Sequence, residues 1–334
     1  MDSTSRVLLD RVQRSFPIVQ QPYRVLSEGM EISEEEVRER IGILKQSKVI
    51  RQISAIFNTG ALGYRSSLVA MSVPQDALER AAQTVNAYQG VSHNYLRPGN
   101  FNMWFTIAVP PGQCLDTVVA ELSTKAAYAS GATAALPALV LPAVKKYKLA
   151  VVLDLLEDGD WDHTEEKSEL PPLVSDTSFR PTPANIRIVK CIQEDLPLVQ
   201  RPFGAWADSL KMQESELLAT ISDWMRHWTI RRFAAVLNHR RVGFRANGMV
   251  VWNCPQDRID RIGEILASFS EVSHCYSRPA YPEWPYNLYA MIHGRSPEEC
   301  DSIAHRLAHA TGLDNFRILF SMKEYKKIRL KLFW

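Results

Sequence analysis

The eight residues VSHNYLRP at positions 91–98 occur a second time, as VSHCYSRP at positions 272–279. The two copies differ only at their fourth and sixth residues, and the shared letters are chemically active ones. Because successive side chains of a strand point to opposite faces, His93, Tyr95 and Arg97 are predicted to lie on one face of a sheet. That face would carry an imidazole, a phenol and a guanidinium together, which makes it the candidate site.

The repetition extends through the rest of the chain. FPIVQQPY at 16–23 returns as LPLVQRPF at 196–203, and Pro-Gln-Asp at 74–76 returns at 255–257. Single arginines also recur at matching places, Arg51 with Arg231 and Arg65 with Arg245. The sequence is therefore an internal duplication with a period of about half its length.

Each half begins with a helical pattern. Apolar residues at helical spacing predict a helix over 4–14, a second short helix follows Pro22, and a third opens at Ser33 with Glu36 in capping-box position. Residues 49–57 have the composition of a short strand or wing. Three helices and a wing indicate a winged helix-turn-helix.

The remainder of each half predicts the element order β-α-β-β-α-β, which is the ferredoxin-like arrangement. The fold class is thus α+β, with two tandem copies of a winged helix-turn-helix plus a ferredoxin-like domain. The predicted boundaries are 1–60 and 61–153 for the first copy, 154–183 for an acidic and proline-rich linker, and 184–240 and 241–334 for the second copy. Ferredoxin-like units commonly pair through their sheets, so we expect a pseudo-dimer with two unequal pockets.

Composition narrows the function classes. The chain has 334 residues, a formal net charge of +2 and five cysteines without a C-x-x-C pair. The small net charge gives no overall attraction to nucleic acid, and the cysteine pattern argues against a zinc site or a disulfide framework. No apolar run is long enough to span a membrane. These features predict a cytoplasmic protein without a membrane association.

The residues around the repeated motif suggest a site for a flat, anionic ligand. A lone histidine is often only a strand cap, but His93 and His274 recur together with Tyr95 and Tyr276, which favours a catalytic set. Arg97 and Arg278 each precede a proline at a strand exit, where an exposed guanidinium could hold a carboxylate. Aromatic side chains beside the motif could form the pocket wall, although such residues are commonly core. Lys145 and Lys146 are either a solvated strand end or a cationic rim.

The helix expected to read DNA is acidic. Residues 33–48 carry Glu34, Glu35, Glu36 and Glu39, and the matching helix carries Glu214, Glu216 and Asp223. A major-groove helix usually presents basic and amide groups instead. DNA binding is therefore poorly supported in both copies.

On these motifs the chain resembles the Lrp/AsnC family, and within it the siroheme decarboxylase branch, as a fusion of two related subunits. The resemblance implies removal of carbon dioxide from two acetate side chains of siroheme, giving 12,18-didecarboxysiroheme for d-type haem or an alternative haem pathway. It implies no added cofactor and no separate metal site, because the iron belongs to the substrate; one histidine, His93 or His274, could instead ligate that iron. A second decarboxylase subunit pair is a possible partner.

Under this resemblance, the histidines supply protons, the tyrosines hydrogen-bond nearby, and the arginines hold spectator carboxylates. The full substrate-binding set comprises Arg51, Arg65, Arg97, Asn102, Trp104, Lys145 and Lys146 in the first half and Arg231, Arg245, Arg278, Trp284, Asn287 and Tyr289 in the second. Two other functions stay open from the residues alone. One is a DNA-binding regulator that senses a small molecule or tetrapyrrole, and the other is a tetrapyrrole carrier without catalysis.

Overall fold

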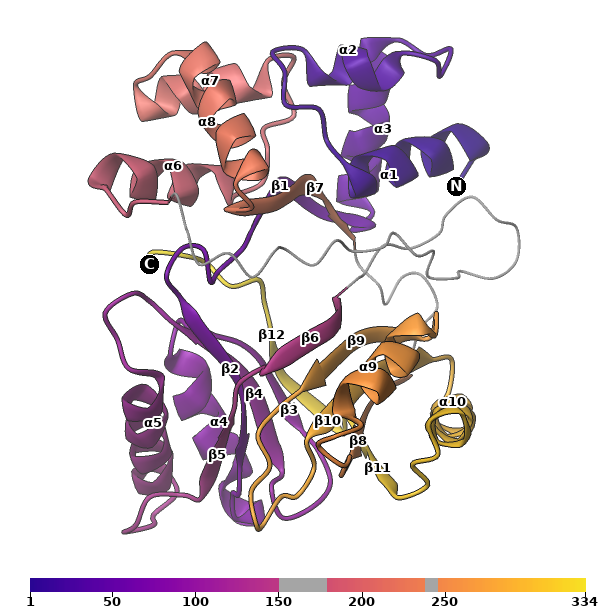
Figure 1. Ribbon diagram of the computed structural model, residues 1–334. Helices are drawn as coiled ribbons and strands as arrows, with labels where there is room; N and C mark the ends of the chain where they lie inside the picture. Colours follow the sequence, from indigo (N-terminus) through magenta and orange to yellow (C-terminus); the bar gives the residue numbers. More distant parts are fainter. Residues whose placement is uncertain (150–178, 238–245) are drawn as a thin grey trace.

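The computed structural model describes residues 1–149, 179–237 and 246–334, so most of the predicted linker and Arg245 lie outside the described residues. Two copies of the same architecture are present, with the helical parts at one end and the larger sheets at the other (Figure 1). Three helices open each copy: α1 (Ser3–Arg14), α2 (Pro22–Ser27) and α3 (Glu34–Gln46), then α6 (Pro183–Ile192), α7 (Pro202–Leu210) and α8 (Glu214–Arg226).

Short polar side chains set where these helices start. Asp2 accepts a hydrogen bond from the Ser5 backbone N–H at 2.7 Å, and Ser33 accepts one from that of Glu36 at 3.1 Å. Thr182 does the same for α6, which carries Pro183 at its first position. These caps satisfy amides that would otherwise lack a partner, and they confirm the predicted start of the third helix at Ser33.

The predicted wing strand connects the two copies through strand pairing. β1 (Ile50–Phe57) pairs antiparallel with β7 (Ile230–Leu237) of the other half, and the two strands form a sheet of their own. The strand prediction for 49–57 is therefore correct, but its partner comes from the distant copy. One apolar core under this ribbon includes Leu8 and Ile41 from the first helical part and Phe203 and Ile221 from the second. The two helical parts are consequently one packed unit.

The two ferredoxin-like units follow the predicted order. The first contains β2 (Arg65–Met71), η1 (Gln75–Ala77), α4 (Leu78–Ala87), β3 (Val91–Leu96), β4 (Met103–Val109), α5 (Leu115–Ala129) and β5 (Ala138–Leu141). The second contains β8 (Ala246–Trp252), α9 (Ile259–Ser268), β9 (Val272–Ser277), β10 (Leu288–Gly294), α10 (Pro297–Thr311) and β11 (Phe316–Phe320).

Each sheet takes its fifth strand from the other half of the chain. β6 (Lys145–Leu149) pairs with β9, and β12 (Lys323–Lys327) pairs with β3. The strand orders are therefore β12-β3-β4-β2-β5 and β11-β8-β10-β9-β6. The last strand of the first ferredoxin-like unit is β5, whereas Lys145 and Lys146 lie on the edge strand of the second sheet.

The two sheets face each other, and the helices α4, α5, α9 and α10 lie on their outer sides (Figure 1). A core between the sheets includes Ala70 and Trp104 from one and Val251 and Tyr289 from the other. Separate cores lie under each helix pair. Within the described residues, every helix is too short or too polar to cross a lipid bilayer.

Candidate active site

One pocket of about 460 Å³ lies where the two sheets face each other, at the end near the β1–β7 ribbon. Both copies of the repeated motif line it: His93, Tyr95 and Arg97, and His274, Tyr276 and Arg278. The expectation of two separate pockets is wrong for these motifs, because facing sheets direct both sets toward the same space. Further lining comes from Arg51, Leu68, Trp104, Thr106, Val236, Leu237, Asn247, Met249, Tyr289, Met291, His293 and Lys327.

Strand alternation places the motif as predicted. His93 and Tyr95 point into the pocket, whereas Asn94 between them is fully buried on the other side and donates a hydrogen bond to the Asn86 side chain of α4 at 3.0 Å. In the second half, Cys275 takes that position and belongs to the core under α9 and α10. The prediction that the chemically active residues share one face is confirmed.

Neither motif arginine is exposed, because Arg97 is buried and Arg278 is half-buried. Arg97 is 4% exposed and donates from Nη1 to the Leu319 carbonyl of the opposite sheet. Arg278 donates in the same way to the Leu141 carbonyl. The Nε–H groups of both side chains are buried without a hydrogen-bond partner. Each guanidinium thus joins the two sheets and also lines the pocket.

Aromatic rings and burial set the electrostatics of these guanidiniums. Arg97 lies 5.5 Å from the Tyr95 ring centre, and Arg278 lies 5.0 Å and 5.4 Å from those of Tyr276 and Tyr289. Burial lowers the pKa of Arg97 to about 10 and also lowers the pKa of Arg278. A cation that loses water in this way gains more from a bound carboxylate than an exposed one does.

The first half holds its histidine in a hydroxyl cluster. His93 Nδ1 lies 3.0 Å from Ser92 Oγ, which lies 2.8 Å from Thr106 Oγ1. Burial, with Lys327 and Arg51 nearby, lowers the pKa of His93 from 6.5 to about 4. The predicted role of His93 as a proton donor is not favoured by this environment, because an imidazolium would be desolvated next to two cations.

The second half surrounds its histidine differently. His274 Nδ1 lies 2.9 Å from Ser273 Oγ, and the same oxygen lies 2.8 Å from His293 Nε2. His293 was not among the predicted residues. Its even spacing from Tyr289 along β10 indicates that His293 shares the face of Tyr289. The repeat could not identify His293, because Ala108 occupies the matching position in the first half.

A further difference lies beside the tyrosines. Lys146 is in register with Tyr276, whereas Glu324 is in register with Tyr95. Burial raises the pKa of Tyr276 to about 12, although Arg278 and Arg231 oppose the rise. The pKa of Lys146 is lowered by partial loss of hydration and by Arg231 and Arg278. The second wall of the pocket is therefore the more cationic one near its phenol.

Comparison with known proteins agrees with this architecture. An AsnC-like ligand binding domain matches residues 61–148 and 241–326, and a siroheme decarboxylase NirDL-like HTH domain matches residues 5–51 and 185–231. A siroheme decarboxylase from Hydrogenobacter thermophilus is 37% identical over 327 residues, which is 98% of this chain and 94% of that protein. The chain belongs to the siroheme decarboxylase family.

Two other members of the siroheme decarboxylase family bear on the pocket. The crystal structure of the siroheme decarboxylase NirDL in co-complex with an iron-uroporphyrin III analogue has a TM-score of 0.77 and 33% identity, covering 98% of this chain and 94% of that one. The siroheme decarboxylase NirH subunit of Pseudomonas aeruginosa is 41% identical over 149 residues, 44% of this chain and 87% of that protein. Half of the present chain thus corresponds to a separate subunit elsewhere in the family.

Several predicted substrate-binding residues of this family member lie away from the pocket. Asn102 exchanges two hydrogen bonds with the Val73 backbone, at 3.0 Å and 2.8 Å, and Asn287 does the same with Cys254, both at 2.8 Å. Each side-chain amide therefore holds the backbone that follows a strand in place, at Val73 after β2 and at Cys254 after β8. The others among the described residues that do not line the pocket are Trp284 in the core between the sheets, Lys145 paired with Asp260, Lys146 opposite Tyr276 on the edge strand, exposed Arg65, and Arg231 next to Tyr276.

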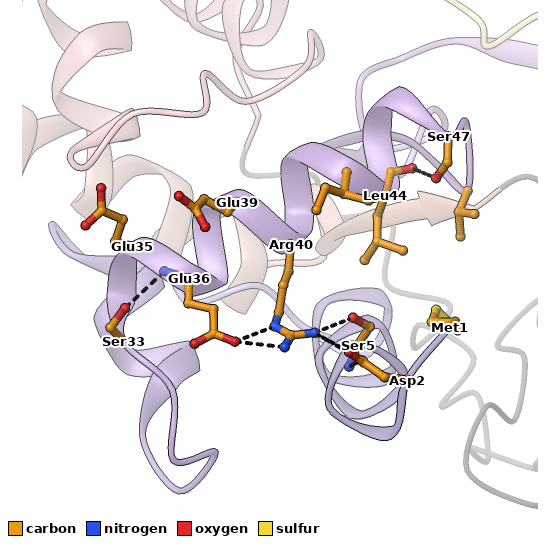
Figure 2. A pocket seen from close by; sticks show the side chains of 12 residues that line it. Met1, Asp2, Ser5, Ser33, Glu35, Glu36, Glu39, Arg40, Leu44 and Ser47 are labelled. Carbon is orange, nitrogen blue, oxygen red and sulfur yellow. Dashed lines mark hydrogen bonds and ion pairs between the residues drawn. The ribbon is translucent and has the colours of Figure 1, made fainter.

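A second pocket, of about 820 Å³, lies between α1 and α3 and bears on the DNA-binding alternative. Figure 2 shows Glu35, Glu36 and Glu39 along α3, with Arg40 between Asp2 and Glu36. Glu35 and Glu39 are exposed, and the one arginine lining this pocket is occupied by two carboxylates. An acidic surface on this helix repels a phosphate backbone, so the structure does not favour a DNA-reading function.

Proposed function

We propose that this chain is a siroheme decarboxylase that removes carbon dioxide from two acetate side chains of siroheme and yields 12,18-didecarboxysiroheme, for d-type haem or an alternative haem. The single observation that carries this proposal is the pocket that both motif copies share. It combines aromatic walls with buried guanidiniums, which suits a flat macrocycle fringed with carboxylates. Membership of the family supports it independently.

The guanidiniums suit carboxylates that stay on the substrate. Decarboxylation removes the negative charge of the leaving group, so a cation that neutralised this carboxylate would stabilise the ground state more than the transition state. We therefore assign Arg97 and Arg278 to spectator carboxylates, since both guanidiniums line the pocket. The leaving acetate would lie farther from both guanidiniums.

The two histidines are proposed to have different roles, one toward the transferred proton and the other toward the substrate iron. When the carbon–carbon bond breaks, its electron pair enters the macrocycle, and the new methylene carbon must receive a proton. We assign that proton to His274, with Tyr276 hydrogen-bonding nearby. His93 is held neutral, and a neutral imidazole is the form that binds a metal, so His93 suits the axial position on the substrate iron, with Tyr95 beside it.

The proposed reaction consumes only a proton and is redox-neutral, so it needs no cofactor beyond the iron that siroheme brings. Cytoplasmic siroheme is the proposed substrate source, because five cysteines without a disulfide suit a reducing compartment. A second decarboxylase subunit pair remains a proposed partner, since relatives of half this length carry subunit names.

The test is anaerobic incubation of the purified chain with siroheme, with the product analysed by mass. We expect the loss of one and then two carbon dioxide units. Tight binding with an unchanged mass, also after addition of a separately purified decarboxylase subunit pair, would instead indicate a tetrapyrrole carrier. Fragmentation of the product would show which two side chains have become methyl groups.

A further inference from the structure

Two cationic side chains reach the pocket beside His93 from strands outside the repeated motif. Arg51 comes from β1 and Lys327 from the end of β12, and both line the pocket. Strand pairing places Lys327 in register with His93. Burial lowers the pKa of His93, and the charges of Lys327 and Arg51 lower it further. The two cations therefore lie on the same side of the pocket, next to one imidazole.

The C-terminal end of the chain keeps Lys327 on the pocket side of β12. The preceding residue, Lys326, lies on the helix side of the sheet and donates from Nζ to the Asn86 carbonyl at 2.6 Å. Two residues after Lys327, Arg329 donates to the Ala55 carbonyl of β1, the strand that also carries the pocket arginine. The two strands that supply the cations are thus fixed to each other.

The second half does not repeat this pair of cations. On β6, Leu149 is the residue in register with His274. Arg231, the counterpart of the pocket arginine on β1, lies next to Tyr276 and does not line the pocket. Among the described residues, the cation pair beside a histidine is therefore present on one wall only, and it is not part of the frame that both halves share.

The charges of the lining suit a ligand with several carboxylates. Four of the described lining residues are arginine or lysine, and none is aspartate or glutamate. Neighbouring cations in a partly desolvated pocket repel each other, so a pair of neighbouring carboxylates that neutralises both is favoured over a single one. Each pyrrole ring of siroheme carries such a pair, an acetate and a propionate on adjacent carbons.

We propose that Arg51 and Lys327 form a subsite for the acetate and the propionate of one pyrrole ring, an inference that rests on siroheme being the substrate as proposed above. Cations that neutralise an acetate stabilise its ground state and oppose the loss of its charge. The ring held by this subsite thus keeps its acetate in the product, and the reacting acetates lie elsewhere in the pocket. Arg51 and Lys327 accordingly select which acetates are retained.

The test measures binding of iron-uroporphyrin III and iron-coproporphyrin III to the full chain by absorbance titration. The first porphyrin carries an acetate and a propionate on every ring, whereas the second has a methyl group in place of each acetate. Lys327→Met should weaken binding of iron-uroporphyrin III about tenfold. It should weaken iron-coproporphyrin III less than about threefold, because a single carboxylate can still pair with Arg51. Lys327→Arg keeps the charge and should bind both like the wild type.

Turnover of siroheme gives an independent measurement. Under anaerobic conditions Lys327→Met should raise KM about tenfold and leave kcat within about threefold, because a retained carboxylate makes the same contact in the ground state and the transition state. The matched control is Lys326→Met, a substitution of the adjacent lysine on the opposite face of β12, which should bind both porphyrins like the wild type.

Several outcomes would overturn the subsite. They are an unaffected Lys327→Met variant, equal losses with the two porphyrins, a lower kcat at unchanged KM, a Lys326→Met variant as weak as Lys327→Met, or a wild-type chain that does not bind iron-uroporphyrin III. A wild-type chain that binds iron-uroporphyrin III but leaves the mass of siroheme unchanged would remove the proposed decarboxylation alone, since the binding measurements decide the subsite without it.

Discussion

Replacing Arg97 by methionine distinguishes the effect of its buried charge on stability from its effect on substrate binding. The fall of the Arg97 pKa to about 10, caused mainly by burial, corresponds to about 3 kcal/mol against the charged form. The hydrogen bond to the Leu319 carbonyl returns about 1.5–3 kcal/mol, while the favourable effect of Tyr95 is already contained in the net pKa. These contributions nearly cancel, so we expect the free energy of unfolding of the ligand-free variant to change by less than about 2 kcal/mol.

Substrate binding should respond much more strongly. In the variant, a carboxylate of siroheme enters a buried position without its cation, which costs about 2–5 kcal/mol. That loss corresponds to a weakening of at least about 30-fold in Kd. Anaerobic absorbance titration with siroheme measures the affinity, and urea denaturation of the ligand-free chain measures stability.

Arg329 provides the matched control for this experiment. It is also a mostly buried arginine, with a pKa lowered to about 10, and it donates to Ser54 and to the Ala55 carbonyl, but it does not line the pocket. Arg329→Met should change stability and leave siroheme affinity within about threefold. If Arg97→Met behaves like Arg329→Met in both measurements, Arg97 only joins the two sheets, and its assignment to a substrate carboxylate is refuted.

Three further predictions follow from the same contacts. Asn287→Ala removes both hydrogen bonds to the Cys254 backbone and should lower the free energy of unfolding by about 2–4 kcal/mol in urea, while a tenfold loss of siroheme affinity would restore its substrate-binding role. The pKa of His93 in the folded chain, about 4, lies below its unfolded value of 6.5. The free energy of unfolding should therefore fall by about 3 kcal/mol as the pH falls from 6.5 toward 4, because the unfolded chain binds the extra proton. His93→Gln should remove this pH dependence from urea denaturation curves. Duplex DNA should show no salt-sensitive mobility shift with the wild-type chain, and Glu35→Lys with Glu39→Lys should create one.

Most of the fold was accessible from local patterns. The serine cap at Ser33, the repeated strands around His93 and His274, and the order of helices and strands are all decided by residues close together in the chain. Period-two alternation was sufficient to place the motif on one face, because burial of Asn94 and Cys275 on the other face fixes the register of both strands. These are short-range effects, and sequence patterns report them well.

The partners of the edge strands were not accessible in the same way. β6 carries Lys145, Lys146 and Lys148, a composition that suits the edge of either sheet, and only the geometry of the folded pair directs it to β9. The burial of Arg97 is likewise a consequence of the opposite sheet, whose Leu319 carbonyl it reaches. A side chain at a strand exit looks exposed in sequence when the surface that covers it lies in the other half of the chain.

A search for repeated residues also misses the positions at which the two copies differ, and here those positions change the chemistry of the pocket walls. Repetition of residues identifies the frame that both walls need: a histidine, a tyrosine and an arginine. The single events in which the copies diverge, Thr106 against Met291 and Ala108 against His293, are invisible to a search for repeats. Under the proposed decarboxylation of two side chains in one pocket, unequal walls would let one histidine stay neutral while the other supplies the proton. Fusion into one chain keeps these unequal walls paired with each other, which a symmetric dimer of either half could not do.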